Sequence, residues 1–284
     1  MGEPAWKMPP GENGEPDDDS TGTVLVQRWV ERPDGSFELM EWPPTLEDYL
    51  DPRLGDQLPQ GNPHAVVRRT LADVLYWYFR PEEDVFVLED VKILLGPGLP
   101  GPAPDVSVIR GARDRDPNFE SFDVVKKGGF PCLLIEVISP SDARIRRMDE
   151  EDKKDLYERV GIPEYLLVDT PRRAKRPHFR IYGYRLGLGK RYRLIEPDGD
   201  GRILSETTGF RFGISPDGQA IEIFDPAGNR LLASGEAWER VAHEEEGRKA
   251  AEERAVHEEE GRKAAEAELA RLRAEIARLK KNSQ

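Results

Sequence analysis

Alternating apolar and polar residues in the first part of the chain predict strands. Residues 23–42, TVLVQRWVERPDGSFELMEW, alternate on both sides of a Pro-Asp-Gly turn, as a β-hairpin does. A short helix and loop are expected over 43–63. Residues 64–79 place apolar side chains at helical spacing with no internal glycine or proline, so they predict a longer helix. Residues 84–95, DVFVLEDVKILL, are strand-like again.

Two runs in the middle of the chain are almost wholly apolar, which is typical of strands buried on both faces. They are PDVSVI at 104–109 and CLLIEVIS at 132–139, and the polar segment 110–129 separates them as an excursion between strands. YLLVD at 165–169 predicts another buried strand.

A helix is expected between the second and third of these strands. It begins at about residue 142 and ends at Val160, because Gly161 and then Pro163 form the usual stop signal. Further strands separated by turn sequences continue to about residue 230, as in a meander. The pattern predicts one α/β domain over residues 23–235.

Both ends of the chain differ from this core. Residues 1–22 are rich in Pro, Gly, Glu and Asp and predict a disordered acidic tail. Residues 236–284 contain HEEEGRKAAE twice, 14 residues apart, which is a spacing of two heptads. The last heptads then carry apolar residues at alternating steps of three and four: Leu269, Leu272, Ile276 and Leu279. We expect a coiled-coil helix, and for the repeated part a solvated single helix is an equal alternative.

Composition and charge narrow the possible functions. The net charge is −13, but residues 1–60 hold 14 acidic and 4 basic side chains, so the remaining core is nearly neutral. A strongly basic surface, the usual mark of a tight nucleic-acid-binding module, is therefore not expected, whereas an enzyme with a local basic patch stays an open alternative. The lone Cys132 rules out an internal disulfide. No membrane-length apolar run or signal peptide is visible, so we expect a cytoplasmic protein that binds no membrane.

Asp105 and Glu136 are the main candidates for chemistry, because each lies in one of the two apolar runs. Burying a lone carboxylate costs several kcal/mol unless a cation or hydrogen-bond donor compensates it. A divalent metal compensates both, and Mg²⁺ needs only one or two protein carboxylates besides substrate phosphate oxygens. The pair therefore predicts a Mg²⁺ (or Mn²⁺) site for phosphodiester hydrolysis.

Lys153 is the candidate cation of this site. Asp149, Lys153 and Tyr157 are four residues apart, so they project from one face of the predicted helix. Lys154 is rotated by about 100° around the helix axis and is the weaker candidate. The alternative is an ordinary Asp-to-Lys pair on a solvated helix surface.

These residues resemble a known family. Asp105 in PD, Glu136 in IEV and the run EVISPSD…D…K…Y…GIPEYLLVD look like the Uma-type restriction endonuclease branch of the PD-(D/E)XK nuclease superfamily, over roughly residues 62–185. The resemblance implies a restriction-endonuclease-like fold with Asp105 and Glu136 as metal ligands. Ile138 stands where the usual E-x-K motif has its lysine, and in this branch the lysine is taken to have moved onto the next helix, at Lys153 here.

Three further residues enter through the same resemblance. His64 matches the branch's helix-initial histidine and could contact a phosphate or a metal-bound water, although a simple helix-start role is equally open. Glu89 and Asp90 are additional candidates for the acidic cluster. The glutamate-containing hairpin usual before that helix has no clear copy in this chain.

Three functional hypotheses follow. The first is a Mg²⁺-dependent DNA endonuclease that acts as a homodimer, with the tail from 236 as a possible interface. The second is an inactive nuclease-fold protein that recruits partners through its coiled coil. A metal-dependent hydrolase of another phosphodiester, such as RNA, is the third.

Overall fold

The computed structural model of the chain describes residues 25–53, 62–114, 116–138, 146–171 and 177–249, with five isolated helical residues beyond (254, 258, 259, 262 and 263). By its internal contacts the chain divides into two compact units, Met1–Ala233 and Ser234–Gln284. The predicted tail over 1–22 and most of the predicted coiled coil lie outside the described residues.

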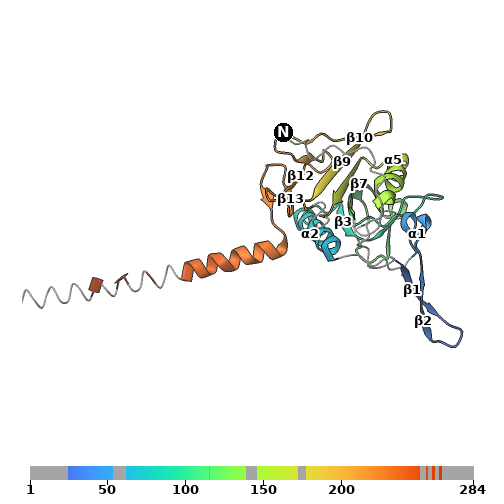
Figure 1. Cartoon of the computed structure of the whole chain (residues 1–284), viewed down its shortest axis with the longest axis horizontal. Coiled ribbons are helices and arrows are strands. Elements are labelled where there is room, and N and C mark those ends of the chain that lie inside the picture. The colour runs from blue at the N-terminus through green and yellow to red at the C-terminus, as the bar shows by residue number, and fades with distance from the viewer. Residues whose placement is uncertain are drawn as a thin grey trace, which may run out of the picture. The chain divides into compact units, whose positions relative to one another are not determined.

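A six-stranded sheet forms the centre of the first unit (Figure 1). Its strands in spatial order are β10 (Tyr192–Leu194), β9 (Arg180–Leu186), β8 (Glu164–Asp169), β7 (Gly128–Ile138), β5 (Val106–Ala112) and β3 (Val85–Glu89). Only β7 and β8 run parallel, and the other neighbours are antiparallel. The predicted mixed α/β architecture is confirmed.

Helices cover both faces of this sheet. Apolar side chains of α2 (Asn62–Phe79), among them Leu71 and Leu75, share one core with Ile135 of β7. Side chains of α5 (Lys154–Val160), among them Leu156, share a second core with Leu134 of β7. Because neighbouring strand residues point to opposite faces, α2 and α5 lie on opposite sides of the sheet.

Smaller elements surround this core. They are the hairpin β1 (Val26–Glu31) and β2 (Phe37–Trp42), helix α1 (Leu46–Leu50), the parallel pair β4 (Lys92–Leu94) and β6 (Ser121–Asp123), and helix α3 (Val124–Lys127). A second, antiparallel sheet contains β11 (Ile203–Leu204), β12 (Arg211–Ile214), β13 (Ile221–Phe224) and β14 (Arg230–Leu231). The predicted N-terminal hairpin and C-terminal meander are therefore present.

Three strand predictions need correction. Residues 84–95 do not form one strand, because Asp90 has a positive φ of 54° and turns the chain between β3 and β4. The segment 110–129 is not only an excursion, since β5 continues to Ala112 and β7 already begins at Gly128. Asp105 stands one residue before β5 rather than inside it.

The predicted helix over about 142–160 is not a uniform α-helix. The described part contains a π-helical turn, η1 (Met148–Lys153), directly before α5. The predicted stop is confirmed, because Gly161 adopts a left-handed conformation with φ 86° and its N–H bonds back to Glu158 and Tyr157. Residues 142–145 lie outside the described part of the chain.

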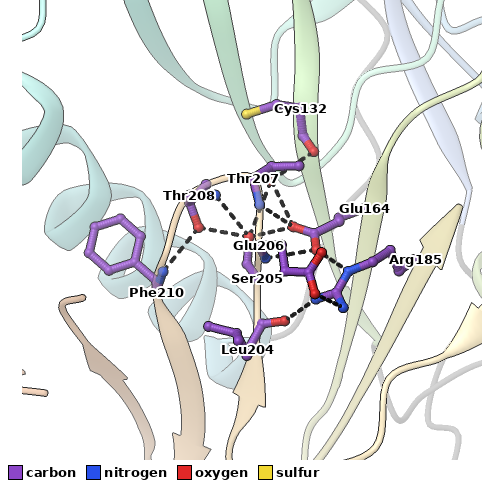
Figure 2. Close-up of polar contacts among 9 residues, drawn as sticks. All are labelled: Cys132, Glu164, Arg185, Leu204, Ser205, Glu206, Thr207, Thr208 and Phe210. Atoms are coloured by element: carbon purple, nitrogen blue, oxygen red, sulfur yellow. Dashed lines mark hydrogen bonds and ion pairs between the residues drawn. The ribbon is translucent and has the colours of Figure 1, made fainter. Parts of the chain in front are cut away.

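A buried glutamate connects the six-stranded sheet to the segment that follows β11 of the four-stranded sheet (Figure 2). The carboxylate of Glu164, at the start of β8, accepts hydrogen bonds from Arg185 Nε at 2.8 Å, Ser205 Oγ at 2.5 Å and Thr207 Oγ1 at 2.7 Å. The backbone N–H of Glu206 adds a bond of 2.9 Å. Burial alone would raise the pKa of Glu164, but these bonds outweigh it and lower that pKa.

The described part of the second unit is helical over 234–249, with Trp238 and Val241 exposed. None of the described helices is both long enough and apolar enough to cross a membrane. The coiled coil remains a prediction.

Candidate functional site

Asp105 and Glu136 lie side by side where two inner strands of the central sheet, β5 and β7, begin and end respectively. The register that pairs Val106 with Ile135 places Asp105 opposite Glu136, and the Glu136 side chain contacts Tyr157 of α5. The backbone N–H of Asp105 lies 3.4 Å from Glu136 Oε2, and Asp105 Oδ2 accepts a bond of 2.8 Å from the N–H of Val137. The two side chains are almost fully buried.

Lys153 reaches this pair from the helix that follows β7. Its Nζ lies 2.9 Å from Glu136 Oε2 and 2.9 Å from Asp149 Oδ1. The hydroxyl of Tyr157 donates to the other oxygen of Glu136 at 2.8 Å. The structure thus brings Asp149, Lys153 and Tyr157 together on Glu136, whereas Lys154 lies over the ring of Tyr184, 5.2 Å from its centroid.

His64 approaches Asp105 from the other side of the sheet. It stands in the first turn of α2, is 3% exposed, and its Nε2 lies 3.1 Å from Asp105 Oδ2. Because an ionised carboxylate only accepts, Nε2–H is the donor of this bond. Within the described part of the chain, His64 Nδ1 is buried without a hydrogen-bond partner.

Arg68 was missed by the sequence analysis. It lies one helical turn after His64, and its guanidinium binds Glu89 Oε1 at 3.0 Å and Asp90 Oδ2 at 3.1 Å. The same Nη1 comes within 3.9 Å of Asp105 Oδ1. Glu89 and Asp90 are thus connected to the site through Arg68. Arg68 stands four residues after His64, and this spacing, which puts both side chains on one face of the helix, could have indicated Arg68 as a site residue.

Burial and mutual repulsion shift the acid–base behaviour of the carboxylates. Burial, with contributions from the charges of Asp105 and Asp149, raises the pKa of Glu136 to about 8 in spite of Lys153. Burial likewise raises the pKa of Asp149. For Asp105 burial acts in the same direction, but the hydrogen bond and charge of His64, together with Lys153, lower its pKa.

Lys153 stays positively charged in this environment. Burial alone would lower its pKa, but the charges of Asp149, Glu136 and Asp105 outweigh that effect and raise the pKa above its ordinary value. Three buried carboxyl groups, those of Asp105, Glu136 and Asp149, therefore surround a single lysine, and burial disfavours the ionised forms of Glu136 and Asp149. Such a cluster is stabilised by an additional cation.

A hard divalent cation fits the donor set of the site. Asp105 and Glu136 offer carboxylate oxygens from neighbouring strands, and Mg²⁺ accepts one or two protein carboxylates with waters completing its octahedron. Among the described residues, no group of three or more His, Cys, Asp and Glu side chains forms a complete ligand cage. Asp105 and Glu136 are the residues that would hold such a cation.

Comparison with known proteins identifies the family of this chain. The model of the Uma2 family, described as "Putative restriction endonuclease", matches residues 38–227, which is more than half of the 284-residue chain. A search of curated proteins finds no match. A solved structure titled as a putative nuclease belonging to DUF820, from Anabaena variabilis, is 18% identical, covers 53% of this chain and 77% of its own, and has a TM-score of 0.36. On the strength of the family match, the chain belongs to the Uma2 family of restriction-endonuclease-type proteins.

Proposed function

We propose that this protein is a Mg²⁺-dependent endonuclease that hydrolyses DNA phosphodiester bonds. Asp105 and Glu136 are the proposed metal ligands, and Lys153 assists the attacking water. The observation that carries the proposal is the 2.9 Å contact between Lys153 Nζ and Glu136 Oε2 beside Asp105. This contact gives the site the lysine that Ile138 does not supply.

Each protein group has a defined task in this proposal. A Mg²⁺ ion held by the two carboxylates would polarise the phosphate and lower the pKa of a bound water. Lys153 donates hydrogen bonds and offsets the negative charge that builds up on the phosphate oxygens. Asp149 holds the ammonium group of Lys153, and Tyr157 fixes the carboxylate plane of Glu136.

His64 is the proposed positioning residue of Asp105. Its Nε2–H fixes one carboxylate oxygen, so the other is presented to the cation in one orientation. With the proton on Nε2, the buried Nδ1 is an acceptor, and it has no hydrogen-bond partner among the described residues, so a water could donate to it.

The choice of DNA as substrate follows the family description rather than a feature of the site, and RNA shares the same chemistry. The alternative, an inactive nuclease-fold protein that recruits partners through a coiled coil, is not favoured by the family match. The main reason for that alternative is the absence of a lysine at position 138. Lys153 lies 2.9 Å from Glu136, so this reason is weaker.

We also propose that the active form is a homodimer. Two sites related by a two-fold axis suit cleavage of both strands of a duplex, and the helical tail from 236 is the proposed interface. Light scattering on the full chain and on a truncation after residue 235 tests this. A dimer is expected for the full chain and a monomer for the truncation. If both proteins are monomers, the homodimer proposal is wrong.

Activity is tested by incubating the protein with supercoiled plasmid and Mg²⁺ or Mn²⁺. Nicked and linear products are expected, and chelation of the metal with EDTA is expected to abolish them. Asp105→Asn and Glu136→Gln should each reduce cleavage by at least a hundredfold. Cleavage that is insensitive to EDTA and to both substitutions would refute the proposal.

A further inference from the structure

Tyr165 connects the sheet to the backbone of the helix that carries Lys153. It lies in β8, is fully buried, and its hydroxyl donates to the backbone carbonyl of Asp149 at 2.8 Å. Asp149 belongs to the π-helical turn η1 and is also the residue whose carboxylate holds Lys153. The Tyr165 hydroxyl therefore fixes the backbone at Asp149, the first residue of the helix face that also carries Lys153 and Tyr157.

We propose that Tyr165 is a positioning residue that holds the π-helical turn in the register that presents Lys153 to Glu136. The inference rests on the proposed function, because that function makes Lys153 a catalytic residue. It gives Tyr165, which has no task in the proposed function, the task of holding the helix backbone.

The geometry of the turn explains why this register matters. An α-helix rotates by about 100° per residue, so residues four apart drift by about 40°, and Asp149 would lie about 80° from Tyr157. A π-turn contains more residues per turn, so it rotates less per residue and offsets this drift. Lys153 can therefore contact Asp149 and Glu136 at 2.9 Å each while Tyr157 still reaches Glu136 at 2.8 Å.

The turn needs an anchor because π-helical backbone is rare and occurs mostly as single turns. The Tyr165 ring is well placed to provide one. Its ring packs edge-on against Tyr157 at a centroid distance of 5.1 Å and stacks with Tyr184 at 6.1 Å and with Tyr192 at 6.4 Å. Held between these rings, the hydroxyl points at the Asp149 carbonyl, and a buried hydroxyl rarely remains without such a partner.

Tyr192 provides a matched control. It belongs to the same aromatic stack, and its hydroxyl also donates to a backbone carbonyl, that of Ile162, at 2.9 Å. Ile162 follows the end of α5, so this bond holds no part of η1. Tyr165→Phe and Tyr192→Phe thus remove the same kind of bond from two ends of one helix.

The test combines local hydrogen exchange with kinetics on the full chain. In Tyr165→Phe, amides of residues 148–154 are expected to exchange faster than in the wild type, with β7 and β8 unchanged, and kcat for plasmid nicking is expected to fall about tenfold at constant KM. Tyr192→Phe is expected to leave both quantities within about twofold of the wild type. Replacing Tyr165 by 4-aminophenylalanine, which keeps a donor, is expected to restore them.

The two readouts separate this inference from the proposed function. If the wild type cuts no nucleic acid, the endonuclease proposal fails, and exchange over 148–154 still decides the role of Tyr165. Equal exchange in the two phenylalanine variants would overturn the inference. Faster exchange in Tyr165→Phe with an unchanged kcat would overturn it as well.

Discussion

Lys153 and Glu136 form a buried ion pair, with Nζ 2.9 Å from Oε2, although they come from a helix and a strand. In the usual E-x-K arrangement the lysine follows the glutamate on the same strand. Here the helix after β7 supplies the ammonium group, and Ile138 packs into the apolar core. The candidate site thus takes Glu136 from β7 and Lys153 from the following helix, so its geometry depends on the position of that helix relative to the strand.

Asp149→Asn should lower kcat by about tenfold, because Lys153 then keeps only one of its two anchoring carboxylates. The neutral side chain retains the size of the aspartate, so the fold should be unchanged. Asp155→Asn, on the exposed face of α5, is the matched control and should retain wild-type activity. Equal activities of the two variants would remove Asp149 from the mechanism.

His64→Ala should weaken Mn²⁺ binding about tenfold, measured by calorimetry, because residues that orient a metal ligand typically contribute this much. The physical cause is the loss of the bond from His64 Nε2 to Asp105 Oδ2. His178→Ala changes an exposed histidine near the second sheet and should leave the affinity unchanged. Unaltered Mn²⁺ binding in His64→Ala would show that His64 does not position Asp105 for the metal and has only a structural role at the start of the helix.

Glu164→Gln should destabilise the protein at neutral pH by about 2–4 kcal/mol, measured by urea unfolding, because the carboxylate accepts four short bonds that an amide cannot all replace. The folded pKa of Glu164 is lowered, so its contribution to stability is present above the ordinary glutamate pKa and is lost as pH falls. The difference between wild type and variant should therefore shrink on acidification through that range.

Glu206→Gln is the control for this pH dependence. Glu206 pairs with Arg185 Nη1 at 2.7 Å, but its side chain is 62% exposed, so the change should cost less than about 0.5 kcal/mol. A stability difference for Glu164→Gln that stays constant from neutral to acidic pH would contradict the charged state of this residue.

The central sheet was predictable because β7 and β8 are buried on both faces and therefore appear as continuous apolar runs. The helix stop at Gly161 was predictable from a local rule. The break at Asp90 was not, because a positive φ at an aspartate is a conformation that the surrounding contacts impose.

The candidate site also has features that the sequence predicted and features that it did not. The spacing of Asp149, Lys153 and Tyr157 predicted that they share a face, and the structure places them on Glu136. The π-helical turn and the bond from Tyr165 were not predictable, since both depend on the distance between the helix and the sheet. Arg68 and the Glu164 network were likewise missed, because their partners lie far away in the sequence.

The most direct test of the displaced lysine compares two neighbouring substitutions in a plasmid-nicking assay with Mg²⁺. Lys153→Met should lower the cleavage rate by about a hundredfold to a thousandfold, because the proposed function needs the Lys153 charge to stabilise the phosphate oxygens. Lys154→Met removes a contact with the ring of Tyr184 and should stay within about threefold of the wild type. Equal rates for the two variants, or a larger loss for Lys154→Met, would contradict the assignment of Lys153.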